Sequence, residues 1–207
     1  MRTEDVIGYA AIFFGILGSW GLYRQTRMIW ATKSAQSVSG TWTITFLAMF
    51  IAFLIYGVQQ NSFPMSFQGG LRVAFSLPVT IGFFMYGKSC KKDWALVLVY
   101  LLLLSAMWFR YLSPWIYTLF SFLGVASSFV QADTIRKNRS RGKVVVELQI
   151  IYLLAITCWC VYGFIRKDLA VFLASVGFIM SYSSTIFMWF KYPNSVESSE
   201  KASLAKA

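Results

Sequence analysis

Long runs of uncharged, mostly apolar residues alternate with short polar segments along this chain. A helix of roughly 17–25 apolar residues crosses the hydrocarbon core of a bilayer. Transmembrane β-strands are shorter, about 9–11 residues, and alternate between apolar and polar positions. The observed runs are longer and apolar on all sides, which predicts an all-α integral membrane protein. The runs are Val6–Tyr23, Thr41–Leu71, Val73–Gly87, Trp94–Phe109, Tyr111–Ala132, Leu148–Ile165 and Leu169–Phe190.

These runs predict seven transmembrane helices. The third run is short, and it makes a full span only if its helix starts near Phe67 and Arg72 snorkels outward. The fourth run is Leu-rich and nearly free of polar groups, so we expect its helix to face lipid. The expected helices are Val6–Gln25, Thr41–Gln60, Phe67–Lys88, Asp93–Phe109, Trp115–Arg136, Val144–Ile165 and Leu169–Phe190.

Composition and charge agree with a membrane protein and predict its orientation. Of the 207 residues 57% are hydrophobic and only 13% are charged, and the net charge is +11. Fourteen of the 19 Lys and Arg residues fall in segments that would share one side of the membrane. Cytoplasmic loops carry such an excess. We therefore expect the N-terminus outside, the C-terminus in the cytosol, and basic loops that contact lipid headgroups rather than nucleic acid.

The first and last thirds of the chain resemble each other at a fixed offset of 106 residues. Leu17-Gly18 aligns with Leu123-Gly124, and Tyr56-Gly57 aligns with Tyr162-Gly163, with no gap between them. After three spans the chain is on the opposite side of the membrane, so a second copy that followed directly would have the inverted orientation. One extra span between the copies gives both the same orientation. We therefore expect two parallel three-helix bundles joined by a linker helix, in a 3+1+3 arrangement. The expected divisions are a first repeat at 1–88, a linker at 89–110, a second repeat at 111–191, and a disordered cytosolic tail at 192–207.

Several short motifs resemble those of the PQ-loop and SWEET-type (MtN3-like) transporter superfamily. Arg24-Gln25 and Val130-Gln131 stand where the family has Pro-Gln at the cytosolic end of each repeat's first helix. The segment Lys33–Ser39 resembles the loop that follows this motif in the family. Trp159-Cys160-Val161-Tyr162-Gly163, followed by Asp168, resembles its Trp-x-x-Tyr-Gly motif and downstream Asp, and Phe53 to Gly57 occupies the same place in the first repeat.

The resemblance implies a carrier with a central cavity, and it indicates which residues line it. Trp159 is the best candidate to stack on a solute, with Phe53 in the matching position of the first repeat. The positions of the family's two pocket asparagines correspond here to Gln68 and Ser175. Ser76 is a further hydroxyl candidate. Gln68 instead belongs to a solvated outer loop if that loop covers Gln59–Gly70, and the hydroxyls have helix packing as an alternative role.

A second set of residues is expected at the motifs and gates, namely Arg24, Gln25, Gln131, Asp133, Tyr56 and Tyr162. A carboxylate within a membrane is by default a functional hypothesis, usually a proton site. Asp133 also has a simpler interpretation, because the basic residues that follow it offer salt bridges. An ion pair between Arg24 and such an acid would form an inner gate.

Enzymatic chemistry has no support in the sequence. The chain has no histidine, which is the commonest general base and metal ligand, and no phosphate-binding or nucleophile motif. We expect no catalytic residues, no metal site and no cofactor. The expected partners are a small-molecule solute and the lipid bilayer, and a homo-oligomer stays open. The main hypothesis is a transporter of a small polar solute that works by alternating access; the alternative is a receptor or sorting protein that binds a ligand without moving it.

Overall fold

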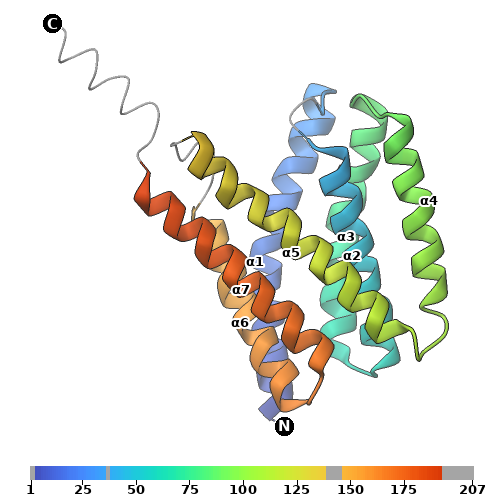
Figure 1. The fold of residues 1–207 in the computed structure, drawn as a ribbon, viewed down its shortest axis with the longest axis vertical. Coiled ribbons are helices and arrows are strands. Elements are labelled where there is room, and N and C mark those ends of the chain that lie inside the picture. Colours follow the sequence, from blue (N-terminus) through green and yellow to red (C-terminus); the bar gives the residue numbers. More distant parts are fainter. Residues whose placement is uncertain (1–2, 36–37, 139–145, 193–207) are drawn as a thin grey trace, which may run out of the picture.

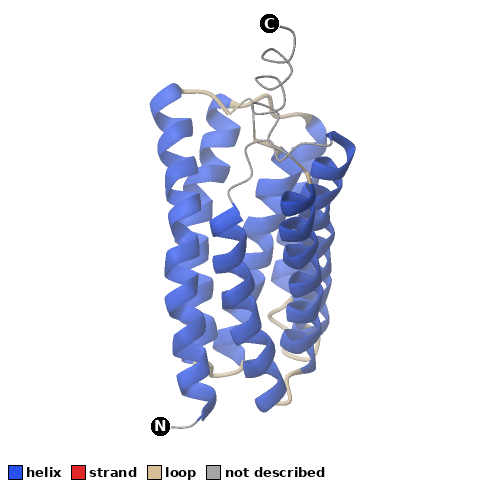
Figure 2. Cartoon of the chain, turned by 90° about the vertical axis from the view of Figure 1, so that its left-hand side faces the viewer, coloured by secondary structure: helices blue, strands red, loops and turns tan. Residues whose placement is uncertain are grey.

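The computed structural model describes residues 3–35, 38–138 and 146–192, and this part of the chain contains seven α-helices and no strand. Figures 1 and 2 show the helices running side by side as a bundle. The helices are α1 (Thr3–Thr32), α2 (Gly40–Gln59), α3 (Phe63–Tyr86), α4 (Lys91–Ala106), α5 (Ser113–Asn138), α6 (Val146–Ile165) and α7 (Leu169–Lys191). The expected tail at 192–207 falls almost wholly outside the described residues.

Six of these helices are each long and apolar enough to cross a membrane, namely all except α4. Together with the fold, this identifies an integral, multi-pass membrane protein. Helix α4 has 16 residues and lies at the outer edge of the bundle (Figure 1), packed mainly on α2. Its leucine-rich surface is exposed, with Leu98, Leu101 and Leu102 each 57–63% accessible, which is what an apolar helix facing lipid requires.

Helix boundaries follow local capping groups. Ser62 caps α3 and accepts a hydrogen bond from the Met65 backbone N–H at 3.4 Å, with Pro64 in the first turn. The third helix therefore begins at Phe63, one turn before the expected start at Phe67. Asp168 caps α7 in the same way, accepting from the Val171 N–H at 3.1 Å.

The turns between α2 and α3 and between α6 and α7 have the same backbone structure at the 106-residue offset. The N–H of Ser62 donates to the carbonyl of Gly57 at 2.9 Å, and the N–H of Asp168 donates to the carbonyl of Gly163 at 2.8 Å. Asn61 and Lys167, which correspond to each other, both have left-handed backbones, with φ of 50° and 56°. A Cβ on either motif glycine would lie about 2.7–2.8 Å from backbone nitrogen of the next helix. The Tyr-Gly motif thus allows each helix pair to pack closely.

Contacts between helices fall into two groups that meet at a shared boundary. Helices α1 and α2 both pack on α3, and α5 and α6 both pack on α7. Across the boundary, α1 contacts α6 and α2 contacts α5. The buried core includes Ala52, Phe120 and Tyr162, which are at most 1% exposed.

Candidate solute-binding cavity

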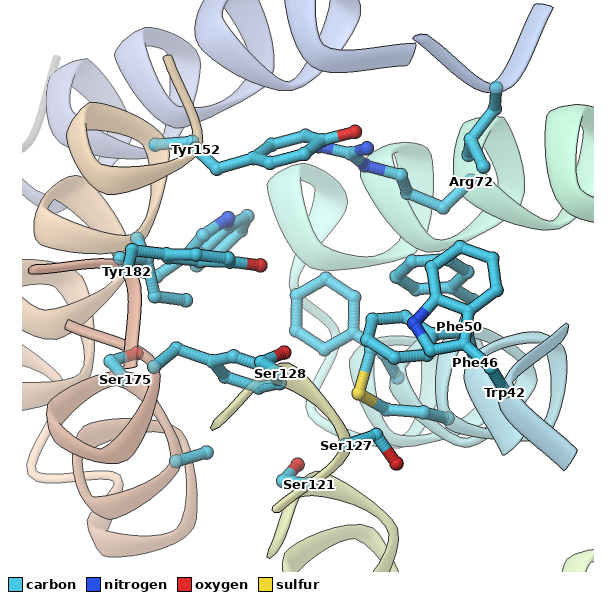
Figure 3. Close-up of a pocket in the computed structure, with 18 of the residues that line it drawn as sticks. Trp42, Phe46, Phe50, Arg72, Ser121, Ser127, Ser128, Tyr152, Ser175 and Tyr182 are labelled. Carbon is cyan, nitrogen blue, oxygen red and sulfur yellow. The ribbon is translucent and has the colours of Figure 1, made fainter. Parts of the chain in front are cut away.

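A cavity of about 620 Å³ lies between the two groups of helices. It is lined by α1, α2, α3, α5, α6 and α7, and no residue of α4 contributes. Figure 3 shows aromatic rings on its walls with serine hydroxyls between them. A pocket of this size, mostly apolar with a few convergent polar groups, is typical of small-molecule sites.

The aromatic part of the wall is centred on Phe53 of α2 and Trp159 of α6. Their rings meet edge to face with centroids 5.1 Å apart. Tyr117 of α5 stacks on Phe53 with centroids 5.8 Å apart. Trp159 is 4% exposed, and its indole N–H has no hydrogen-bond partner among the described residues. The predicted Trp and its counterpart therefore lie together at the cavity, with one buried donor left free.

One end of the cavity is closed by hydrogen bonds between the two helix groups. Tyr56 of α2 donates to both oxygens of Asp168, at 3.1 and 3.0 Å. Tyr162 of α6 shares a hydrogen bond of 2.5 Å with Ser62, and Arg166 donates to the Tyr162 hydroxyl at 3.0 Å. Each motif tyrosine thus bonds to the residue that caps a helix of the other group.

The cavity extends to the opposite end of the bundle. There it is lined by residues near the end of α1, the start of α2, the end of α5 and the start of α6, namely Gln25, Ser39, Thr41, Val130 and Leu148. Gln25, a predicted motif residue, therefore contacts the cavity. In the described structure, hydrogen bonds close one end of the cavity. The other end of the cavity lies between the ends of α1, α2, α5 and α6.

Arg72 of α3 faces the cavity and is only 7% exposed. The expectation that it snorkels outward is wrong, because its guanidinium lies between the rings of Phe50 and Tyr152, 5.8 and 5.1 Å from their centroids. Figure 3 shows the side chain extending from α3 toward Tyr152 and Tyr182 on the facing wall. Such cation–π contacts contribute about 0.5–2 kcal/mol each, whereas burying an unpaired charge costs on the order of several kcal/mol.

Two of the predicted polar contacts line the cavity and one does not. Gln68 is a helical residue of α3 rather than part of a loop, is 5% exposed, and its amide oxygen has no partner among the described residues. Ser175 also lines the cavity, although its hydroxyl donates to the carbonyl of Val171 at 2.7 Å. Ser76 lies outside the lining, buried where α3 packs on its neighbours.

Arg24 and Asp133 lie near the opposite end of the bundle, outside the cavity lining. Arg24 is exposed on the outer surface of α1, and no described acid pairs with it. Asp133 binds Arg136 and Lys137 of its own helix at 2.7 and 2.6 Å, as the salt-bridge interpretation predicts. The side chain of Gln131 lies outside what the structure describes.

Sequence reasoning misses two parts of the wall. Arg72 is expected to snorkel outward, and the ring of Tyr152 is not among the candidates, whereas the run Ser181–Thr185, which includes Tyr182, is expected to line part of a path. Tyr152 donates to the carbonyl of Gly18 at 2.9 Å, and Tyr182 stacks on Tyr152 with centroids 5.7 Å apart. The signal for Arg72 was its isolation within a long apolar stretch, which marks an intramembrane charge as functional.

Comparison with known proteins finds a similar solved structure but no match by sequence. No family model matches the chain, and no curated protein matches it either. Among solved structures, a eukaryotic SWEET transporter superposes with a TM-score of 0.76 at 15% sequence identity. The match covers 92% of this chain and 99% of the transporter. The predicted resemblance is confirmed at the level of structure: the chain has the fold of a SWEET transporter.

Proposed function

We propose that this chain is a membrane transporter that moves a small polar solute, such as a sugar, an amino acid or a vitamin-like molecule. The observation that carries the proposal is the cavity of about 620 Å³, which is bonded shut at one end and reaches the helix termini at the other. A carrier needs a site that opens to one side at a time. The SWEET-like fold supports the same function by analogy.

The architecture that we propose is 3+1+3, with a first unit at 1–88, a linker at 89–110 and a second unit at 111–191. Two observations support it. The turns at Asn61 and Lys167 have matching backbone bonds at the 106-residue offset. Helices α1 and α2 both pack on α3, and α5 and α6 both pack on α7, while α4 packs mainly on α2.

In this proposal, transport proceeds by rocking of one unit against the other around the cavity. The bonds from Tyr56 to Asp168 and between Tyr162 and Ser62 break when the closed end opens. The basic segments lie at the other end, and the positive-inside rule makes that end cytosolic. The described state is then open to the cytosol, with the N-terminus outside.

Within the cavity, Trp159 and Phe53 supply the surface on which a solute stacks, and Gln68 and Ser175 supply polar contacts. Gln25 lines the cytosolic mouth. We assign the inner gate to the helix ends that carry Arg24, Gln131 and Asp133, which must approach one another when the outer end opens.

Uptake into liposomes that contain the purified protein tests the function. We expect saturable uptake of at least one solute from a panel of sugars, amino acids and vitamins. The variant Trp159→Ala should abolish it, while Trp94→Ala should not, because Trp94 is 59% exposed on α4. Saturable binding of a solute or peptide by folded protein without any flux would contradict the proposal and select the receptor alternative.

A further inference from the structure

The described residues of the cavity wall carry one positive charge and no negative one. Among the described residues that line it, Arg72 is the only charged side chain, and neither Asp nor Glu contributes. Arg72 is the tenth residue of α3, so its Cα lies about 14 Å along the helix axis from the first residue. That depth places the charge well inside the membrane.

No described carboxylate forms an ion pair with Arg72, and Glu147 at the start of α6 is exposed. Asp168 accepts from Tyr56, Asp133 pairs with Arg136 and Lys137, and Asp93 accepts from the Cys90 N–H at 2.8 Å. The recorded contacts of the guanidinium within the described structure are the rings of Phe50 and Tyr152. Rings hold a cation in place but accept no directed hydrogen bond from its five N–H groups. The guanidinium is therefore fixed in position with its donors unused.

Two other buried polar groups face the same space. The Trp159 indole N–H is a donor without a partner among the described residues, and the Gln68 amide oxygen is an acceptor without one. Gln68 precedes Arg72 by one helical turn, so both side chains lie on the same face of α3. Figure 3 shows hydroxyls of Ser121 and Ser127 on another part of the wall. The described wall thus combines one cation with neutral donors and acceptors that suit hydroxyl groups, and it has no anionic side chain.

From this arrangement we infer that the cavity binds a solute with a single carboxylate group and neighbouring hydroxyls, such as a hydroxy acid or a sugar acid, with the carboxylate on Arg72. A planar guanidinium forms two parallel hydrogen bonds to a carboxylate. A phosphate ester carries about −1.5 to −2 charges at pH 7, which one buried cation leaves partly uncompensated. An amino acid also brings an ammonium group, for which the described lining residues offer no carboxylate.

This inference rests on the proposed function, because it names the class of solute that the transporter takes. Its test uses equilibrium binding rather than flux. Purified full-length protein is titrated with L-lactate, D-gluconate and D-glucuronate, and with their neutral counterparts propane-1,2-diol, sorbitol and D-glucose, and thermal stabilisation is measured. Ligands that bind the native state raise the melting temperature in proportion to affinity and concentration. We expect at least one acid to stabilise the protein at concentrations where its neutral counterpart does not.

Two substitutions at Arg72 and one elsewhere locate the effect. Arg72→Gln should weaken binding of that acid roughly ten- to hundredfold, the usual range for losing a hydrogen bond to a charged group. Arg72→Lys keeps the charge but loses the paired geometry, so it should lie between Arg72→Gln and the wild type. The control is Arg27→Gln, since Arg27 is exposed on α1 outside the cavity, and it should bind like the wild type.

The outcomes separate this inference from the transport proposal. If no acid stabilises the protein, if Arg72→Gln and Arg72→Lys bind as well as the wild type, or if chloride or phosphate stabilises it equally, the inference is overturned. Flux of a neutral solute without binding of any acid would overturn it and leave transport standing. Binding of an acid that depends on Arg72, without any flux, would uphold it and contradict transport.

Discussion

The hydroxyl of Tyr56 donates to both carboxylate oxygens of Asp168, the residue that caps α7. Shifted by 106 residues, the same relation joins Tyr162 to Ser62, the residue that caps α3. Each tyrosine therefore ties its own helix group to the first turn of a helix in the other group. Opening this end requires both ties to break, so they set the balance between the closed and open states.

Replacing Tyr56 with Phe tests the hydrogen bonds between Tyr56 and Asp168. The ring should keep its stack on Tyr117, whose centroid is 4.9 Å away, while the bonds to Asp168 are lost. A hydrogen bond to a charged group contributes about 1.5–3 kcal/mol, so we expect a loss of that order in unfolding free energy. The closed end should also open more often.

Two measurements check this prediction. Denaturant unfolding in detergent measures the free energy of unfolding. In a background without the native cysteines, the rate at which a thiol reagent from the outer side modifies Ser175→Cys measures how often the closed end opens. Tyr111→Phe is the control, because Tyr111 is 73% exposed on the surface. Unchanged stability together with unchanged modification in Tyr56→Phe would show that the bond to Asp168 does not hold this end.

Substitution of Trp159 separates its ring from its N–H. Trp159→Phe keeps an aromatic edge for Phe53 but removes the free donor, so it should weaken solute binding about tenfold, as the loss of one hydrogen bond does. Trp159→Ala should abolish binding while the protein still folds, since the ring borders an existing cavity. Thermal-shift titration with the solute found in the uptake screen measures both. Equal affinity in all three proteins would remove Trp159 from the site.

Sequence alone predicted the parts of this fold that depend on a repeated local pattern. The Tyr-Gly pairs at Tyr56 and Tyr162 aligned at one offset, and the turns that follow them have matching bonds. Helix ends were less accurate, because a charge ends an apolar run without ending a helix. The first helix runs past Gln25 to Thr32, and the third begins at Phe63 because Ser62 caps it.

The cavity wall was harder to predict because it depends on how each helix is rotated by its neighbours. Gln68 and Ser76 lie about two helical turns apart on α3, yet of these two only Gln68 lines the cavity. Further along α3, Thr80 donates to the carbonyl of Ser76 and shares a 3.1 Å bond with Thr43 of α2, so packing holds this part of the helix. The expectation that Arg72 snorkels outward is wrong because the rings of Phe50 and Tyr152, which belong to other helices, hold its guanidinium inside the bundle.

The cap of α4 offers a test of the fold away from the cavity. Asp93 is 8% exposed and accepts from the Cys90 N–H at 2.8 Å. Asp93→Ala should lower the unfolding free energy by about 1 kcal/mol, the usual effect of losing a helix cap, without changing solute affinity. Asp133→Asn is the matched control and should have no measurable effect, since its ion pairs are exposed. Equal stability of both variants in denaturant unfolding would contradict the capping role.

Gly18 of α1 provides the space in which Tyr152 and Arg72 meet. A Cβ at this position would lie 2.9 Å from Tyr152 Cδ1 and 3.0 Å from Arg72 Nη2, closer than side chains normally approach. Gly18→Ala should therefore push the ring or the guanidinium toward the cavity and weaken solute binding by roughly tenfold or more. In Gly70→Ala the new Cβ would meet only Leu54 Cδ1 at 4.0 Å. That variant should bind normally and gain up to about 1 kcal/mol of stability from the helix preference of alanine. Equal affinities of Gly18→Ala and Gly70→Ala in thermal-shift titration would show that the position of Arg72 beside Tyr152 has no part in binding.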